Sequence, residues 1–316
     1  MSTKLFIGPM SKNVVDAVLE LDKNQRNKIG FIPSRRQVER DGGYVNKWTT
    51  NEFANYVAGQ VLIQRDHGGP GQGTNDDDGF ESFAVDAVNL DIIHVDPWKK
   101  YQDYEAGLSK TIEYIEFINQ INPEMLFEVG TEEAIRRFEE DEFEKLLFDL
   151  QDSLRPELYD KIEYAVVQSG VWIDLLYREN TGKFSIERLK NMSLAAHKYG
   201  LKSKEHNGDY LTPEEIQKRF DNGLDAINIA PEFGQIETEC YLDHMESEQI
   251  EEFYKLCYDS DRWKKWVSIE ELSGATQLIS VCGHYVFAEE KFKEIRPQID
   301  EAVKDKIKQR IAEILK

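Results

Sequence analysis

One stretch decides how the fold of this chain is predicted, Val61-Leu62-Ile63-Gln64-Arg65-Asp66-His67-Gly68-Gly69-Pro70-Gly71-Gln72-Gly73. A short apolar run ends abruptly in a base, a carboxylate and an imidazole, and glycines follow. This pattern is typical of a buried strand that delivers its last side chains to the open end of a sheet. The glycines let the backbone approach a ligand closely. The stretch matters because other apolar runs of the chain also end in carboxylates, imidazoles or amides.

Eight apolar runs of this kind are strand candidates, at residues 4–8, 28–33, 61–65, 91–95, 125–129, 164–168, 201–205 and 226–230. Segments with helical periodicity lie between them, and Ser185 and Thr212 stand where helix N-caps are expected, each followed by early acidic residues. Strands that alternate with helices predict a parallel sheet covered on both faces, within the α/β class.

Eight such units favour a closed (β/α)8 TIM barrel over residues 1–234. A doubly wound open sheet is the alternative, but no Gly-x-Gly-x-x-Gly motif follows the first strand. The glycine-rich stretch after His67 has neither that spacing nor a phosphate-loop lysine. Residues 235–316 are predicted to form a mostly helical C-terminal extension packed on the barrel, with residues 278–281 as a strand or a buried turn.

The composition narrows the classes of partner. The 316 residues include 39 basic and 60 acidic side chains, a formal net charge of -21, which argues against binding to nucleic acid or to an anionic membrane. A small anionic substrate stays compatible with this charge, because a few local Arg and Lys residues override the mean field. The three cysteines have no paired spacing, no apolar run reaches the ~20 residues of a membrane span, and no signal-like segment opens the chain. We therefore expect a cytoplasmic protein.

The strand ends carry the candidate chemistry, because in a barrel the loops after the strands form the active face. We predict catalytic roles for Asp66, Asp96 and Glu128, and metal binding by His67, His206 and Glu128. The donor set suits Zn²⁺, with Mn²⁺, Co²⁺ and Ni²⁺ as alternatives. The side chains predicted to contact substrate are Arg35, Arg36, Arg65, Gln168, Asn207 and Asp209.

Each of these residues also has a structural interpretation. A single His at a strand end is more often a hydrogen-bonded structural residue, and Arg35 with Arg36 is also compatible with a plain surface pair. His197 and His244 are expected to be structural, and His284 stays open between the two roles. The clustering of strand-end groups, rather than any one of them, favours a metal-assisted enzyme acting on a small polar substrate.

Six motifs in the same order carry a resemblance to a known family. They are Gln37-Val38-Glu39 with Gly42-Gly43-Tyr44, Arg65-Asp66-His67-Gly68-Gly69-Pro70, Ile93-His94-Val95-Asp96, Glu128-Val129-Gly130-Thr131-Glu132, Val166-Val167-Gln168-Ser169-Gly170-Val171 and Glu205-His206-Asn207-Gly208-Asp209-Tyr210. On these residues the chain resembles the family of the class II D-tagatose-bisphosphate aldolase non-catalytic subunit, which includes ketose-phosphate and tagaturonate epimerase relatives. The resemblance implies a TIM barrel and a sugar or sugar-phosphate substrate.

Related class II aldolases place a catalytic Asp directly before a metal-binding His, a pattern that matches Asp66 and His67. Their second metal-binding His lies at the seventh strand, where this chain has His206. Their third lies at the sixth strand, where this chain has Gln168, so Glu128 or Asp96 would complete a different set.

The favoured function is a metal-dependent epimerase acting on a ketose or ketose phosphate. For epimerisation at C4, Asp66 would move the hydroxyl proton in a retro-aldol and aldol sequence. For C3, two bases on opposite faces are needed, and Asp96 and Glu128 are candidates. Arg35 or Arg36 would hold an anionic end of the sugar.

The alternatives are a class II-type sugar-bisphosphate aldolase and its non-catalytic accessory subunit, which would bind an aldolase-type partner chain. A homo-oligomer is equally compatible with the sequence. The sugar, the carbon epimerised and the metal are not determined by the sequence.

Overall fold

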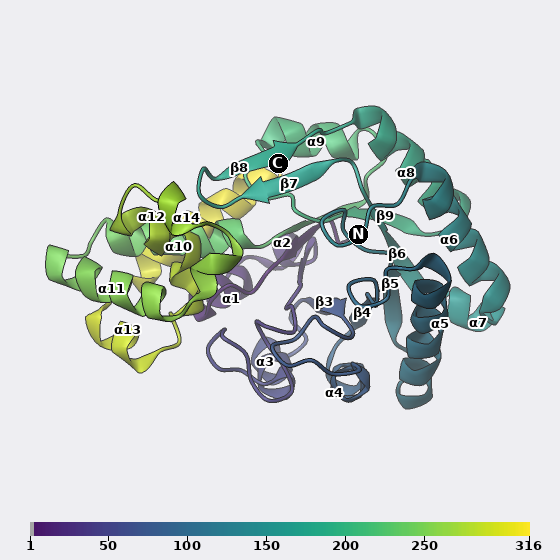
Figure 1. The fold of residues 1–316 in the computed structure, drawn as a ribbon, viewed down its shortest axis with the longest axis horizontal. Coiled ribbons are helices and arrows are strands. Elements are labelled where there is room, and N and C mark those ends of the chain that lie inside the picture. Colours follow the sequence, from purple (N-terminus) through teal and green to yellow (C-terminus); the bar gives the residue numbers. More distant parts are fainter. Residues whose placement is uncertain (1–2) are drawn as a thin grey trace.

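Eight short apolar segments become parallel strands that close on themselves (Figure 1). The structure is a computed structural model that describes residues 3–316. In barrel order the strands are β1 (Leu5–Ile7), β2 (Ile29–Phe31), β3 (Leu62–Gly68), β4 (Ile92–Val95), β5 (Leu126–Val129), β6 (Ile162–Val167), β9 (Lys202–Glu205) and β10 (Ala226–Ile229). Each strand overlaps one of the eight predicted runs, although β3 extends beyond its run to Gly68 and β6 begins before its run at Ile162. The predicted (β/α)8 barrel is therefore confirmed.

Part of the barrel interior is filled by an apolar cluster. Phe6 and Tyr164 meet edge to face there with ring centroids 5.6 Å apart, and Ile92 and Ala226 belong to the same buried cluster. A much larger apolar cluster lies between the strands and the surrounding helices. Because this part of the interior is filled by side chains, the accessible pocket lies at the carboxyl ends of the strands, where some of the polar strand-end residues line it.

Nine helices among the described residues alternate with the strands and cover the barrel. They are α1 (Lys12–Leu19), α2 (Lys23–Arg26), α3 (Thr50–Val57), α4 (Phe80–Asn89), α5 (Tyr104–Ile121), α6 (Glu140–Ser153), α7 (Pro156–Tyr159), α8 (Ile186–Lys198) and α9 (Pro213–Phe220). Their starts follow from local sequence, since Thr49 and Thr212 each form a capping box with an acidic residue three positions later. In α5, Gly107 lets the helix approach the ring of Trp98, where an added Cβ would lie 2.2 Å from a ring carbon.

An antiparallel hairpin interrupts the βα alternation after β6. Its strands are β7 (Val171–Asp174) and β8 (Glu179–Gly182), and Ile173 on β7 lines the central pocket described below. The sequence gives little signal for this hairpin, because its strands are half exposed and lack a buried apolar run.

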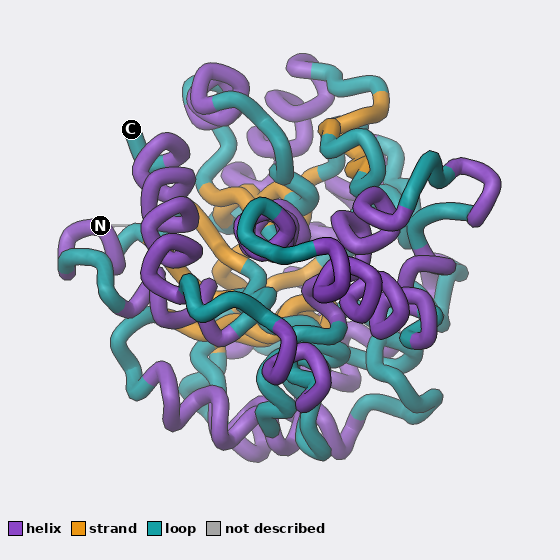
Figure 2. The backbone as a smooth tube through the Cα atoms, turned by 90° about the vertical axis from the view of Figure 1, so that its left-hand side faces the viewer, coloured by secondary structure: helices purple, strands orange, loops and turns teal. Residues whose placement is uncertain are grey.

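The chain after β10 builds a helical lobe and then returns to the barrel. The lobe, residues 231–299, contains α10 (Pro231–Leu242), α11 (Ser247–Asp259), η1 (Arg262–Lys265), η2 (Ile269–Glu271), α12 (Ala275–Cys282), η3 (Gly283–Tyr285) and α13 (Glu290–Ile295). Figure 2 views the lobe from its own side, with the barrel strands behind it. The last helix, α14 (Asp300–Ile314), packs on α1, α9 and α10, and so completes the outer ring between the first and last barrel helices.

The expectation of a strand or buried turn at residues 278–281 was wrong, because this segment lies within α12. Its apolar residues are buried as one face of a helix packed on α10 and α11, a period that a four-residue apolar run cannot reveal. The three cysteines are buried and unpaired. Among residues 3–316, no helix has both the length and the apolar character that crossing a membrane requires.

Candidate active site and metal centre

A backbone irregularity at the end of β3 turns two neighbouring side chains toward one pocket. The pairing of β3 with β4 shifts between Arg65 and Gly68, and His67 has a left-handed φ of 44°. In a regular strand Asp66 and His67 would face opposite sides of the sheet. Because of the irregularity, both line the central pocket. Such local strain in a non-glycine residue is characteristic of functional sites.

Three imidazole rings meet at this point, from His67, His94 and His206. Their ring centroids are 5.0, 5.1 and 5.2 Å apart, a nearly equilateral triangle. The Asp66 Oδ1 atom lies 3.9 Å from His67 Nε2 and 3.8 Å from His206 Nδ1. One donor atom from each of these four residues lies within 4.8 Å of the other three. Of the two predicted histidine ligands, both are in the cluster, and His94 joins them.

One nitrogen of each ring is held from outside the cluster. His67 Nδ1 lies 2.6 Å from an Asp96 oxygen, His206 Nε2 lies 2.7 Å from a Glu128 oxygen, and His94 Nε2 lies 3.0 Å from the carbonyl oxygen of Gly130. Because those oxygens accept, these nitrogens carry the ring protons. The opposite nitrogens of His67 and His206 are thereby left for the centre of the triangle, whereas His94 Nδ1 accepts from the backbone N–H of His67 at 3.3 Å. Carboxylate or carbonyl support of the outer nitrogen is the usual arrangement of metal-binding histidines.

The Asp66 carboxylate adds a test of whether a metal fits. Its Oδ1 atom is buried and has no hydrogen-bond partner, which is costly for a charged oxygen. A cation among the three rings would neutralise it. Three nitrogen donors with one carboxylate match the ligands of Zn²⁺ and also suit Mn²⁺, Co²⁺ or Ni²⁺. The residues present therefore fit a divalent metal.

Electrostatics agree with this fit. Burial alone would lower the pKa of His67, but Asp66, Asp96 and Glu132 together raise it to about 10. The surrounding carboxylates therefore favour a positive charge at this point. Burial outweighs the nearby carboxylates for His94 and lowers its pKa, which favours the neutral ring.

Glu128 lies beneath the cluster, fully buried inside the barrel. Its Oε2 accepts from Gln64 Nε2 at 2.6 Å and from Lys204 Nζ at 2.8 Å. Burial would raise its pKa, but Lys204, His94 and His206 hold that pKa well below the usual range. Glu128 is thus an ionised carboxylate that supports His206 from behind. The structure places it outside the four-residue cluster, although it was predicted as a ligand and a base.

Asp96 supports the His67 ring in the same way that Glu128 supports His206. It is fully buried and accepts from Thr131 Oγ1 at 3.0 Å, from Gln72 Nε2 at 3.2 Å and from the backbone N–H of Trp98 at 3.2 Å. With these donors and His67 its oxygens are occupied. The structure therefore gives Asp96 the position of a support for the His67 ring.

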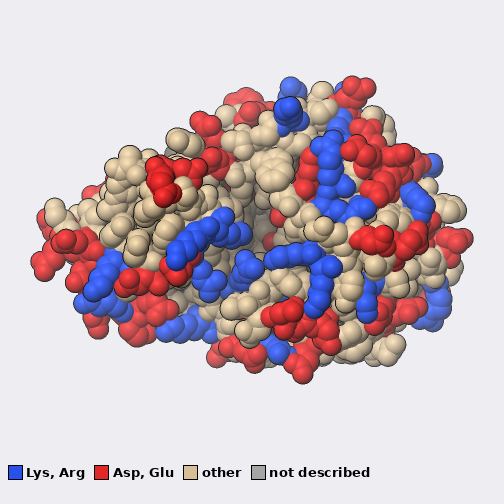
Figure 3. Space-filling view, viewed as in Figure 1, with Lys and Arg blue, Asp and Glu red and all other residues tan. Residues whose placement is uncertain are grey.

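The central pocket lies between the mouth of the barrel and the lobe, with a volume of about 520 Å³. Figure 3 shows the hollow between these two parts, with basic side chains along one side. Asp66 and His67 line it together with Glu132 and Asn207, whose amide donates to a Glu132 oxygen at 2.8 Å. Four basic residues also line it, namely Arg36, Lys99, Arg262 and Lys265.

Two predicted substrate residues, Arg36 and Asn207, reach this pocket. Arg35 and Arg65 do not line it, because both are buried in ion pairs. Arg35 pairs with Asp77 and Glu39, at 2.5 and 2.6 Å, while Arg65 pairs with Asp86 at 2.6 Å.

The side chains of Gln168 and Asp209 form hydrogen bonds with the backbone of the protein itself. Gln168 accepts from the backbone N–H of Phe138 and donates to two backbone carbonyls, each bond being 2.8 Å long. Asp209 accepts from the backbone N–H groups of Ala230 and Glu232, at 3.1 and 2.8 Å. Both side chains hold loops at the barrel mouth.

Several residues that the structure brings to the site are not among the predicted site residues. His94 was named in a motif, and its two-residue spacing from Asp96 was the available signal. Lys204 had no signal, because a lysine inside a strand is usually solvent-exposed. Arg262 and Lys265 belong to a stretch that is basic and aromatic, and this composition was their only signal.

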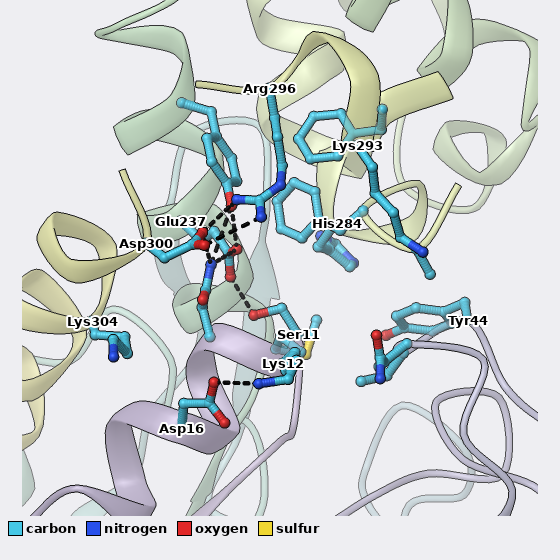
Figure 4. Close-up of a pocket in the computed structure, with 18 of the residues that line it drawn as sticks. Ser11, Lys12, Asp16, Tyr44, Glu237, His284, Lys293, Arg296, Asp300 and Lys304 are labelled. Atoms are coloured by element: carbon cyan, nitrogen blue, oxygen red, sulfur yellow. Dashed lines mark hydrogen bonds and ion pairs between the residues drawn. The ribbon is translucent and has the colours of Figure 1, made fainter. Parts of the chain in front are cut away.

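A second cavity, of about 460 Å³, lies between α1 and the lobe (Figure 4). Tyr44 and His284 line both cavities. Several charges in the second cavity are neutralised in pairs, such as Lys12 with Asp16 at 2.6 Å. Burial lowers the pKa of His284 to about 3, so its ring is neutral, and we give this cavity a structural role.

Comparison with solved structures finds the same fold in several other proteins. A "probable tagatose 6 phosphate kinase" from Sinorhizobium meliloti 1021 superposes with a TM-score of 0.73 at 14% identity, over 96% of this chain and 86% of that one. The fructuronate-tagaturonate epimerase UxaE from Cohnella laeviribosi gives 0.58 at 9% identity, over 99% and 78%. The YdjI aldolase from Escherichia coli K12 gives 0.54 at 12% identity, over 93% and 90%.

The chain shares their fold. These neighbours carry names from the group of proteins that the sequence motifs resemble, and at 9–14% identity the agreement concerns the fold alone. No protein-family model and no curated protein sequence matches the chain.

Proposed function

We propose that the protein is a divalent-metal-dependent epimerase of a ketose or ketose phosphate. The observation that carries the proposal is the buried, unpartnered Asp66 carboxylate oxygen beside three histidine rings, at the floor of an open pocket. Support comes from the shared fold of a named epimerase and a named aldolase.

The chemistry divides between the metal and the protein. A bound Zn²⁺ would act as a Lewis acid that polarises the ketone carbonyl of the sugar. Asp66 takes the proton of the C4 hydroxyl, and the C3–C4 bond breaks with its electron pair delocalised toward the ketone. The aldehyde fragment turns, the bond re-forms on its other face, and Asp66 returns the proton to the new hydroxyl.

The other residues orient the histidine rings and the substrate. Asp96 and Glu128 fix the orientation of His67 and His206, and neither lines the pocket, so we do not propose them as bases for C3 chemistry. Glu132 lines the pocket with its partner Asn207 and is placed to orient sugar hydroxyls. The lobe covers the barrel mouth, which would retain the aldehyde fragment until the bond re-forms.

An aldolase is the second candidate, because the same Asp66 and metal cluster would serve a retro-aldol cleavage that releases both fragments. The difference lies in whether the aldehyde leaves. An accessory role without catalysis is disfavoured by the intact cluster and its support from Asp96 and Glu128.

The test combines metal analysis with nuclear magnetic resonance. We expect the purified, zinc-loaded chain to interconvert ketohexose phosphates in D₂O without placing deuterium on carbon, since retro-aldol chemistry breaks only a C–C bond. Asp66→Asn should abolish interconversion, whereas Asp76→Asn, at an exposed carboxylate of the following loop, should keep full activity. Full turnover by Asp66→Asn would contradict the proposal, deuterium on carbon would replace retro-aldol with proton transfer, and free triose products would favour the aldolase.

A further inference from the structure

The four basic residues of the central pocket share one property. Ion pairs are numerous among residues 3–316, yet none within 4.0 Å joins a carboxylate to Arg36, Lys99, Arg262 or Lys265. The chain has 60 acidic and 39 basic side chains, so unpaired cations gathered at one pocket are contrary to its overall charge.

These cations come from three parts of the fold. Arg36 follows β2, and Lys99 follows β4, at the barrel mouth. Arg262 and Lys265 lie on η1 of the lobe, where Lys265 Nζ lies 4.0 Å from the centre of the Trp266 ring and the Arg262 guanidinium 5.9 Å from that of Tyr285. The aromatic rings support both side chains at the edge of the pocket.

The cations are close enough to oppose one another's charge. Desolvation by the surrounding protein, with Arg36 and Lys99, lowers the pKa of Lys265 to about 8, against the opposite effect of the Glu132 carboxylate. Desolvation and Arg36 likewise lower the pKa of Lys99, and Asp96 and Glu132 offset only part of this effect. An anion among them would remove this repulsion.

The neighbouring lysine provides a contrast within the same turn. Lys264 lies beside Lys265 on η1, but it pairs with Asp261 at 2.7 Å and does not line the pocket. A general excess of positive charge on η1 therefore does not explain the cluster, because only some of its basic side chains face the pocket.

We propose that Arg36, Lys99, Arg262 and Lys265 form a subsite for a dianionic phosphate group of the substrate. This inference rests on the proposed function, because it takes the central pocket as the active site. Two guanidinium groups offer paired donors and two ammonium groups offer point charges, which together suit the oxygens of a phosphate. The substrate then extends from the Asp66 and His67 end of the pocket to the lobe, and is a ketose phosphate rather than a neutral ketose.

The position of this subsite differs from the common arrangement in TIM barrels. Phosphate is frequently held there by the loops after the seventh and eighth strands. Here the cations follow the second and fourth strands, and half of them belong to the lobe. The lobe thus supplies specificity for the charged end of the sugar.

The test measures binding of inorganic phosphate to the metal-free protein by titration calorimetry, so that it does not depend on turnover. The double variant Arg262→Gln with Lys265→Gln should weaken phosphate binding at least about tenfold, since each charged hydrogen bond lost weakens binding by about tenfold or more. Lys264→Gln is the matched control and should bind as the unmodified protein does. Lys99→Gln, on the barrel side, should also weaken binding and guards against a folding defect confined to the lobe.

Three outcomes would overturn the subsite: no saturable phosphate binding, equal affinity in the double variant and the Lys264→Gln control, or tighter binding of acetate than of phosphate, which would point to a carboxylate. Phosphate binding that the variants weaken, in a protein without any sugar interconversion, would uphold the subsite and refute the proposed function. The two proposals therefore fail separately.

Discussion

Replacement of Lys204 by Met tests the buried network beneath the metal cluster. The Lys204 ammonium is fully buried, donates to Gln64 Oε1 at 2.8 Å and pairs with Glu128 Oε2 at 2.8 Å. It also lies 3.6 Å from the centre of the Phe6 ring. Methionine fills most of the same volume, so the main effect is a Glu128 carboxylate that has lost its cation.

The magnitude follows from that uncompensated charge. Breaking a buried ion pair by removing one partner costs about 3–5 kcal/mol, so we expect Lys204→Met to lower the free energy of unfolding by roughly that amount. Glu128→Gln should cost about the same. If the losses added, the double variant would lose about 6–10 kcal/mol, but once both charges are gone no unpaired ion remains. We expect it to lose about as much as one single variant, a coupling of roughly 3 kcal/mol or more.

The assay is urea unfolding at pH 7 of the metal-free protein, followed by circular dichroism. Lys202→Met is the matched control on the same strand, since Lys202 is 39% exposed and pairs with a partly exposed Glu163. It should cost no more than about 1 kcal/mol, as surface ion pairs do. Additive single losses, or a Lys204→Met loss no larger than that of the control, would refute the reasoning.

Further predictions concern other parts of the protein. His94→Ala should lower zinc affinity, measured by competition with a chelator, by more than the about 10- to 100-fold that loss of a ligand's hydrogen-bonding partner costs. Burial raises the pKa of Glu237 to about 7, so the folded state binds this proton more tightly than the unfolded state, and stability falls as pH rises from about 4.5 to 7. The stability of Glu237→Gln relative to the unmodified protein should therefore increase by up to about 3 kcal/mol between pH 4.5 and 8 in urea unfolding, and a pH-independent difference would contradict this. Gly107→Ala should lower the melting temperature by several degrees through its clash with Trp98, by analogy with overpacked cores that lose about 1–3 kcal/mol.

The barrel could be predicted from the sequence because its determinants are local. Each strand is a short apolar run bounded by polar residues or glycine, and parallel strands buried on both faces give that signal directly. The meeting of Asp66, His67 and His206 also followed from the sequence, because a barrel brings the ends of all its strands to one face.

The roles of the polar residues depended on partners that are remote in sequence. Glu128 and Asp96 stand at strand ends as a ligand or a base would, yet each is held behind a histidine, by Lys204 in one case and by Thr131 in the other. The sequence shows the type of each side chain and not which charge it will meet across the barrel.

Arg35 and Arg36 illustrate the same point, because two adjacent arginines have different partners in the structure. Arg35 is buried against Asp77, while Arg36 lines the central pocket with cations from the lobe, more than 200 residues away along the chain. The sequence by itself determined the closed sheet and the face at which the strand-end polar residues gather, because burial of apolar strands is a property of each segment. Only the tertiary structure decided which charges are neutralised and which remain free for a ligand, because that depends on distances between segments that the chain order does not specify.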